Sequence, residues 1–227
     1  MKVIEVNNLN KIYNESEVQV HAVNDVTLAI EQGEFTAIVG PSGSGKTTLL
    51  NMIGGLDEPT SGEIFVDGAN MSLLKGSNLT DFRLMNIGFV FQAYNLIPVL
   101  TAKENTEFIM KLQGKTEAEC KTRSEELLSS VGLGDRLNAR PAKLSGGQQQ
   151  RVAVARALAS KPKFILADEP TANLDSKSTS NLLDIMEKMN REENATFVFS
   201  THDQRVIDKA RRVITLEDGK VVSDESR

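Results

Sequence analysis

Short apolar runs bounded by turn residues alternate along this chain with longer stretches in which apolar positions recur at helical intervals. The first kind of pattern predicts strands and the second predicts helices. The predicted strands lie within 3–6, 21–30, 35–39, 61–68, 87–92, 163–168 and 195–200, and a final hairpin lies within 212–222. Because strands and helices alternate through much of the chain, the pattern predicts an α/β fold with a mainly parallel sheet.

Helical spacing dominates the middle of the chain. Thr101 and Glu104 have the spacing of a capping box at a helix start. The further predicted helices lie within 116–131, 145–158 and 176–190. We therefore expect one domain over residues 1–227, in which 1–92 and 162–227 form the α/β core with an antiparallel β part at the N-terminus. Residues 93–161 form a helical subdomain inserted into this core.

Composition excludes several classes of protein. The net charge of −5 argues against a general nucleic-acid binder, which usually carries a basic excess. A single cysteine, Cys120, excludes an intrachain disulfide, and two histidines exclude a histidine-rich metal site. No run of 18 apolar residues predicts a membrane span, and the N-terminus does not have the pattern of a signal peptide. We expect a cytoplasmic protein.

Residues 40–47 read Gly-Pro-Ser-Gly-Ser-Gly-Lys-Thr and fit the phosphate-binding P-loop pattern. The motif follows a predicted strand and precedes a stretch that suits a helix, which is the context it requires. Backbone N–H groups would surround the phosphates, while Lys46 reaches the β- and γ-phosphates and Thr47 binds Mg²⁺. Alone, the pattern could also be a glycine-rich turn before a core helix. The candidate nucleotide-binding residues are Gly40, Ser42, Gly43, Ser44, Gly45, Lys46, Thr47 and Thr48.

Polar side chains follow three other predicted strands. Asp168 ends an apolar strand, where ligands gather in open α/β sheets, and is placed to hold Mg²⁺ together with Thr47. Glu169 follows at once and can act as the general base that polarises water. Gln92 can ligate Mg²⁺ and sense the γ-phosphate, and His202 ends another strand. Each could be an ordinary surface or structural residue alone, but together with the P-loop they predict a site.

A second candidate anion-binding helix start lies at residues 144–148, Leu-Ser-Gly-Gly-Gln. Ser145 suits an N-cap, and Gly146 and Gly147 allow close backbone approach, with Gln148 following. The bland alternative is an ordinary capped helix. Because the stretch lies apart from the P-loop in the chain, we expect it to meet the nucleotide of another copy.

With these motifs in this order, the chain resembles the ATP-binding-cassette (ABC) ATPases, the nucleotide-binding subunits of ABC transporters. The matching elements are Walker A (40–47), the Q-loop glutamine (Gln92), the signature (144–148), Walker B (164–168), the catalytic glutamate (Glu169), the D-loop (173–175), the switch histidine (His202) and the aromatic that stacks on adenine (Tyr13). The resemblance implies a P-loop NTPase cassette with a RecA-like core, an antiparallel β subdomain and an inserted α-helical subdomain. It also implies ATP and Mg²⁺ as ligands, with Lys46 among the catalytic residues.

Residues 54–57 and 89–98 resemble the lipoprotein-releasing and macrolide-exporter type of cassette. This resemblance implies a head-to-tail homodimer and separate membrane permease subunits that would hold it at the inner face of the cell membrane, with no nucleic-acid partner. Asn173 stands where many relatives have Ser or Gly.

Two other functions are alternatives to transport. An ABC-type ATPase acting on DNA or ribosomes is disfavoured, because the chain has no sustained heptads and holds one cassette. A cell-division relative that signals through a membrane partner stays open. The apolar stretch 94–100 predicts an exposed groove, with Leu96 and Leu100 in it, that receives a helix of the membrane subunit; the alternative for part of the stretch is core.

Overall fold

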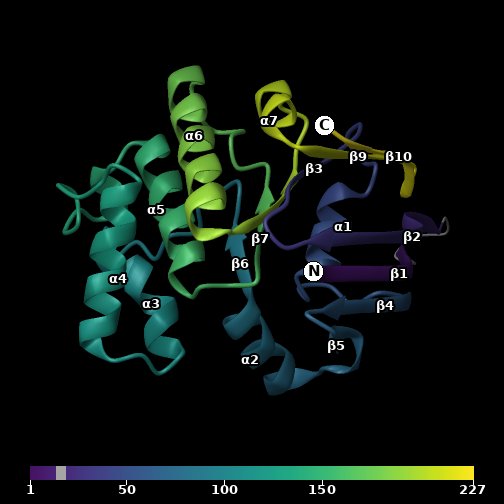
Figure 1. The fold of residues 1–227 in the computed structure, drawn as a ribbon, viewed down its shortest axis with the longest axis horizontal. Coiled ribbons are helices and arrows are strands. Elements are labelled where there is room, and N and C mark those ends of the chain that lie inside the picture. The colour runs from purple at the N-terminus through teal and green to yellow at the C-terminus, as the bar shows by residue number, and fades with distance from the viewer. Residues whose placement is uncertain (14–18) are drawn as a thin grey trace.

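Two β-sheets form the centre of the molecule (Figure 1). The structure is a computed structural model and describes residues 1–13 and 19–227. A four-stranded antiparallel sheet has the order β2-β1-β4-β5, and a six-stranded sheet has the order β10-β9-β3-β8-β7-β6. The first sheet consists of β1 (Lys2–Tyr13), β2 (Val20–Glu31), β4 (Ser61–Val66) and β5 (Ala69–Asn70). The second consists of β3 (Phe35–Val39), β6 (Ile87–Val90), β7 (Phe164–Asp168), β8 (Thr196–Ser200), β9 (Arg212–Glu217) and β10 (Lys220–Ser226).

The six-stranded sheet is parallel except at one edge. β3 pairs in parallel with β8 and β9, and β7 pairs in parallel with β6 and β8, whereas β10 is antiparallel to β9. The carboxyl ends of the five parallel strands therefore meet at one edge of the sheet, and the loops that follow them lie together.

The helices begin where their capping residues predict. Thr101, Thr116 and Ser145 each form a capping box at the start of α3, α4 and α5. The helices are α1 (Lys46–Ile53), α2 (Gly76–Asn86), α3 (Ala102–Leu112), α4 (Glu117–Ser130), α5 (Gly146–Ala159), α6 (Ser176–Glu193) and α7 (Gln204–Lys209), with short 3₁₀ turns η1 (Met71–Leu73) and η2 (Pro141–Lys143). The four helices predicted after residue 100 are confirmed. The sequence did not predict α2, whose residues are all at least partly exposed.

The six-stranded sheet separates two apolar clusters. Residues of β6, β7 and β8 enter both clusters, so Phe197 and Phe199 of β8 lie in one and Val198 lies in the other. One cluster contains the buried sides of α3, α4, α5 and α6, and the other contains α1 and the antiparallel sheet. Figure 1 shows α3–α5 on one side and β1, β2 and β4 on the other. Among the described residues, no helix combines the length and apolar composition that crossing a membrane requires.

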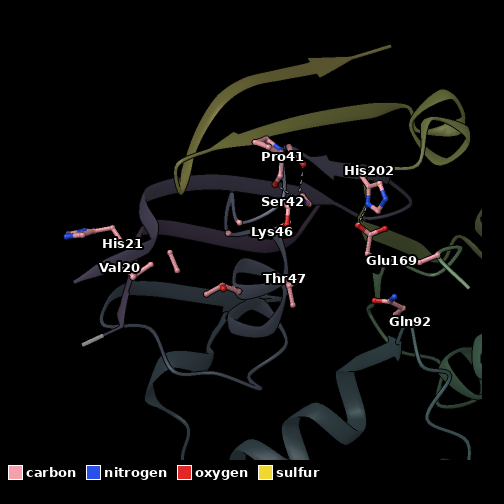
Figure 2. Close-up of a pocket in the computed structure, with 15 residues that line it drawn as sticks. Val20, His21, Pro41, Ser42, Lys46, Thr47, Gln92, Glu169 and His202 are labelled. Carbon is pink, nitrogen blue, oxygen red and sulfur yellow. Dashed lines mark hydrogen bonds and ion pairs between the residues drawn. The ribbon is translucent and has the colours of Figure 1, made fainter. Parts of the chain in front are cut away.

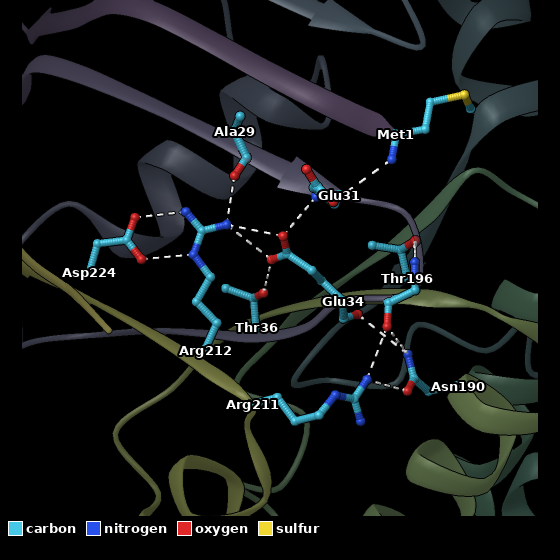
Figure 3. A network of polar contacts seen from close by, with 11 residues as sticks. Met1, Ala29, Glu31, Glu34, Thr36, Asn190, Thr196, Arg211, Arg212 and Asp224 are labelled. Atoms are coloured by element: carbon cyan, nitrogen blue, oxygen red, sulfur yellow. Dashed lines mark hydrogen bonds and ion pairs between the residues drawn. The ribbon is translucent and has the colours of Figure 1, made fainter. Parts of the chain in front are cut away.

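A polar network joins the strands at the opposite edge from the carboxyl ends (Figure 3). The Arg212 guanidinium donates to both carboxylate oxygens of Asp224 at 2.7 Å, to both of Glu34 at 3.1 Å, and to the Ala29 carbonyl at 2.7 Å. The hydrogen bond with Asp224, supported by Glu34, raises the pKa of Arg212 despite its partial burial. The network connects β2, β3, β9 and β10 and holds these strands in place. It lies away from the cavity described next.

Candidate active site

A cavity of about 580 Å³ lies at the carboxyl ends of the parallel strands (Figure 2). Its volume suits a small organic ligand. Ten of the predicted site residues line it: Gly40, Ser42, Gly43, Gly45, Lys46, Thr47, Thr48, Gln92, Glu169 and His202. Pro41 of the predicted P-loop also lines the cavity. The other lining residues, which were not predicted as part of a site, are Val20, His21, Ala22 and Ala172. The structure therefore brings the P-loop together with residues that follow three other strands.

Two of the P-loop glycines are required by close backbone approaches. A Cβ on Gly45 would lie 2.0 Å from the Ala22 carbonyl oxygen, and one on Gly40 would lie 2.1 Å from that of Leu216. Gly45, with a φ of 97°, precedes α1, and no side chain caps this helix. An uncapped helix start offers backbone N–H groups and the positive end of the helix dipole to an anion.

The Lys46 ammonium lies inside the loop. It is 8% exposed and donates to the carbonyl oxygens of Gly40 and Pro41, each at 2.9 Å. An ammonium has three donors, so one of them stays free for a phosphate oxygen. Behind the loop, the Ser44 side chain is buried rather than part of the lining.

Oxygen ligands for a cation meet at the end of β7. The Thr47 hydroxyl donates to Asp168 Oδ1 at 3.0 Å, and Gln92 lines the same cavity. The predicted strand 87–92 ends at Val90, so Gln92 lies in the loop beyond it, where its carbonyl accepts a 3.0 Å hydrogen bond from Asn173 Nδ2. Hydroxyl, carboxylate and amide oxygens suit Mg²⁺, which typically uses one or two carboxylates together with substrate phosphates. Within the described part of the chain, no three His, Cys, Asp or Glu residues cluster for a metal, so the remaining ligands would come from the nucleotide and water.

Glu169 and His202 form a hydrogen-bonded pair at the cavity. Glu169 Oε1 lies 2.7 Å from His202 Nδ1, and the Thr201 hydroxyl donates to Glu169 Oε2 at 3.3 Å. The His202 side chain is 75% exposed, whereas that of Glu169 is 16% exposed. Glu169 has a φ of 44°, a left-handed conformation uncommon for a residue other than glycine. A carboxylate fixed by two neighbours and open to a cavity can accept a proton from a positioned water.

The signature residues lie outside the described lining of this cavity. Ser145 N–H donates to Gln148 Oε1 at 2.9 Å, and Gln148 N–H donates to Ser145 Oγ at 3.3 Å. The two glycines between them also pack within their own chain. A Cβ on Gly146 would lie 2.8 Å from the Tyr94 hydroxyl, and one on Gly147 would lie 2.8 Å from Ser178 Oγ. From the sequence, these glycines were expected to allow close approach of a bound anion; their packing against Tyr94 and Ser178 was not predicted.

Tyr13 lies at the end of β1 and is not among the residues that line the cavity. Its hydroxyl donates to Asp57 Oδ2 at 2.6 Å, and the Lys11 ammonium lies 4.9 Å from its ring centroid. Burial raises the pKa of Asp57, but hydrogen bonds from Lys11 and Tyr13 outweigh it and lower the pKa overall. Val20, which pairs with Tyr13 across the two strands, does line the cavity. Stacking of Tyr13 on adenine stays a prediction.

Comparison with known proteins shows the family of the chain. The ABC transporter family model matches residues 23–172. The chain belongs to the ABC transporter ATP-binding family. An ABC transporter ATP-binding protein of Thermotoga maritima is 47% identical over 226 residues, which cover 100% of this chain and 96% of the relative. The macrolide export ATP-binding/permease protein MacB of Hyphomonas neptunium is 46% identical over 98% of this chain, which spans 34% of that protein.

A solved structure has the same fold. The ATP-binding cassette MJ0796, described as a dimeric post-hydrolysis state bound to ADP and Pi, is 44% identical with a TM-score of 0.90 over 98% of each chain. The predicted fold is confirmed, and the chain is an ATP-hydrolysing ABC cassette that serves a transporter. The chemistry of this family is ATP binding and hydrolysis, so the cavity described above is the candidate ATP site.

Proposed function

We propose that two copies of this cassette close head to tail around two ATP molecules and transmit the closure to separate membrane permease subunits. The observation that carries the proposal is the separation of the P-loop from the signature. The P-loop side of the site lines the cavity, whereas Ser145 and the residues after it start a different helix and contribute nothing to the described lining. A second copy supplies the missing side most simply.

In each site, the roles follow from position. Lys46 would use its third N–H to bind a phosphate oxygen and stabilise the charge that develops during hydrolysis. Thr47, Asp168 and Gln92 would hold Mg²⁺, which would supply positive charge beside the phosphates when bound. Glu169 would accept the proton of the attacking water, and His202 would orient that carboxylate.

An exposed apolar surface supports a membrane partner. Val99 is 70% exposed, and on α3 Phe108 is 40% and Leu112 is 56% exposed. The loop that carries Val99 is fixed to α3, because the buried Asn105 side chain bonds the backbone of Ile97 and Leu100. Exposed large apolar residues in one segment of the chain are candidates for an interaction site. We assign this surface to a helix of the permease. The macrolide-export relatives favour a drug as the cargo, and the resemblance of residues 54–57 and 89–98 keeps peptide export and lipoprotein release as alternatives.

Mixed dimers test the shared site. Lys46→Ala damages the P-loop and Ser145→Arg blocks the signature, so each mutant homodimer should trap no nucleotide. All chains, including the control, also carry Glu169→Gln, so that bound ATP is trapped rather than hydrolysed. When the two mutants are mixed, one site of each heterodimer pairs two intact elements and should trap labelled ATP. Ser130→Arg, the same change on an exposed serine at the end of α4, is the matched control and should behave like the wild type. Absence of trapping in mixed dimers, with the control positive, would refute the head-to-tail arrangement.

A further inference from the structure

The position of Gln92 depends on a loop that has no regular secondary structure. Gln92 lies two residues beyond the end of β6 and its side chain is exposed in the cavity. A ligand to a metal must be held within a fraction of an ångström, and residues on loops achieve this only when their neighbours fix them. The contacts of residues 91–95 therefore determine how well Gln92 can serve the site.

Two side chains of α5 bracket this loop. Gln150 is buried and its Nε2 donates to the carbonyls of Phe91 at 3.3 Å and Pro170 at 2.8 Å. Six residues later on the helix, Arg156 Nη1 donates to the Asn95 carbonyl at 2.5 Å and Nη2 donates to the Tyr94 carbonyl at 2.9 Å. The loop is thus held just before and just after Gln92.

The turn that Arg156 contacts is strained. Tyr94 and Asn95 are consecutive left-handed residues, with φ of 59° and 49°. Such residues persist only where their surroundings hold them, and strain of this kind gathers at functional sites. Among the described residues, no carboxylate forms an ion pair with Arg156, so its recorded acceptors are the two carbonyls of this turn. Burial lowers the pKa of the guanidinium, although arginine keeps its charge.

We propose that Arg156 is a positioning residue for Gln92: its planar guanidinium holds the Tyr94–Asn95 turn and thereby places the Gln92 amide at the metal-binding edge of the cavity. The inference rests on the proposed magnesium site. Arg156 lies on the helix that begins with the signature, so a shift of α5 carries the Gln92 loop with it. The signature that meets one nucleotide and the glutamine that meets the other are therefore held by the same helix.

The test compares nucleotide binding with and without Mg²⁺. A fluorescent non-hydrolysable ATP analogue is titrated into the full-length chain in EDTA and then at increasing Mg²⁺ concentrations. Arg156→Gln should leave the affinity in EDTA unchanged and raise the half-saturating Mg²⁺ concentration by roughly 10-fold, the usual effect of removing a residue that supports a metal ligand. Arg156→Lys, which keeps the charge but not the fork, should give an intermediate shift. It also serves as the test should the glutamine variant fail to fold.

Arg123→Gln is the matched control. Arg123 on α4 also donates to a carbonyl of α5, that of Leu158, and it pairs with Glu193 of α6, but it does not contact the Gln92 loop. Its loss should weaken the packing of the helices without moving the Mg²⁺ requirement. Hydrogen exchange should quicken in peptides covering 91–97 in Arg156→Gln and stay unchanged there in Arg123→Gln.

Asn95→Gly supplies a rescue. Glycine adopts a positive φ without strain, so the turn should need Arg156 less. Adding Asn95→Gly to Arg156→Gln should recover part of the lost Mg²⁺ affinity. An unchanged Mg²⁺ requirement in Arg156→Gln, or an equal shift in Arg123→Gln, would overturn the role of Arg156. A wild-type chain that binds the analogue with an affinity insensitive to Mg²⁺ would instead refute the magnesium site on which the inference rests.

Discussion

Replacing Glu169 with glutamine isolates the proton-accepting role of this residue. The two side chains have nearly the same shape, so the Glu169→Gln variant keeps the backbone conformation, and the new amide oxygen can accept the hydrogen bond from Thr201. The new amide nitrogen can donate to His202 Nδ1, which lies 2.7 Å from Glu169 Oε1 in the wild type. The exposed imidazole makes the original pair a screened contact, worth less than about 1 kcal/mol to stability. The substitution therefore removes the base and little else.

The expected loss in turnover is large. Removing a general base typically costs 10²–10⁴-fold, which corresponds to about 2.7–5.4 kcal/mol in activation free energy. Steady-state phosphate release measures the rate, and binding of a fluorescent ATP analogue shows whether affinity is retained. Glu225→Gln, the same change on an exposed residue of β10, should keep wild-type turnover. Near-normal turnover of Glu169→Gln would refute the role of Glu169, and loss of binding would mean that the substitution damages the site itself.

Two further predictions concern the partner surface and acid stability. Val99→Glu should abolish association with the permease in the native complex, which co-purification measures, while the isolated cassette still folds and binds ATP. The control Val222→Glu, at a 54% exposed valine of β10, should keep the association. A hydrogen bond from Arg205 lowers the pKa of Asp203 from 3.8, so the folded state gains stability above that pH and loses it as the pH falls through the depressed value. Asp203→Asn, which can still cap α7, should flatten this loss in denaturant unfolding below about pH 4; an unchanged acid slope would contradict it.

Leu96 shows where the apolar stretch 94–100 divides. An exposed groove that includes Leu96 and Leu100 was predicted here from the sequence, with core as the alternative. Leu96 packs against the cluster of α3–α6 and both leucines are half-buried, whereas Val99 is exposed. A charge at Leu96 would therefore disturb the core, which is why the prediction above uses Val99.

The buried strands were predictable because their residues are mostly apolar and form recognisable runs in the sequence. Residues 164–167 are buried on both faces of the sheet and therefore form a continuous apolar run in the sequence. β1 extends to Tyr13, but only 3–6 was predicted as a strand. The prediction stopped early because the second half of β1 contains polar residues and has an irregular register, with Asn8 at a φ of 47°. α2 was not predicted, because its residues are all at least partly exposed and form no strong apolar stripe at helical spacing. Apolar periodicity identifies elements that bury a face and misses those that do not.

Motif spacing predicted most residues that line the cavity, but not the residues of neighbouring strands that complete the lining. A P-loop and polar residues after strands can be found along the chain, because the carboxyl ends of parallel strands meet at one edge. The cavity is also lined by three residues of β2: Val20, His21 and Ala22. They reach it only because the fold brings β2 beside the P-loop, where the Ala22 carbonyl closely approaches Gly45. No local pattern marks such residues.

The left-handed residues at the site explain what fixes its geometry. Glu169, Tyr94 and Asn95 have positive φ, although glutamate and tyrosine have no intrinsic preference for it. At Glu169 the backbone N–H donates to the Ser200 carbonyl at 2.9 Å, and at the turn Arg156 binds both carbonyls, so tertiary contacts hold each conformation. Glycine at position 169 would relax the backbone but delete the carboxylate. Asn95 has an exposed side chain, so there glycine changes the strain without removing a proposed ligand. The loop that carries Gln92 is thus where strain and chemistry can be separated experimentally.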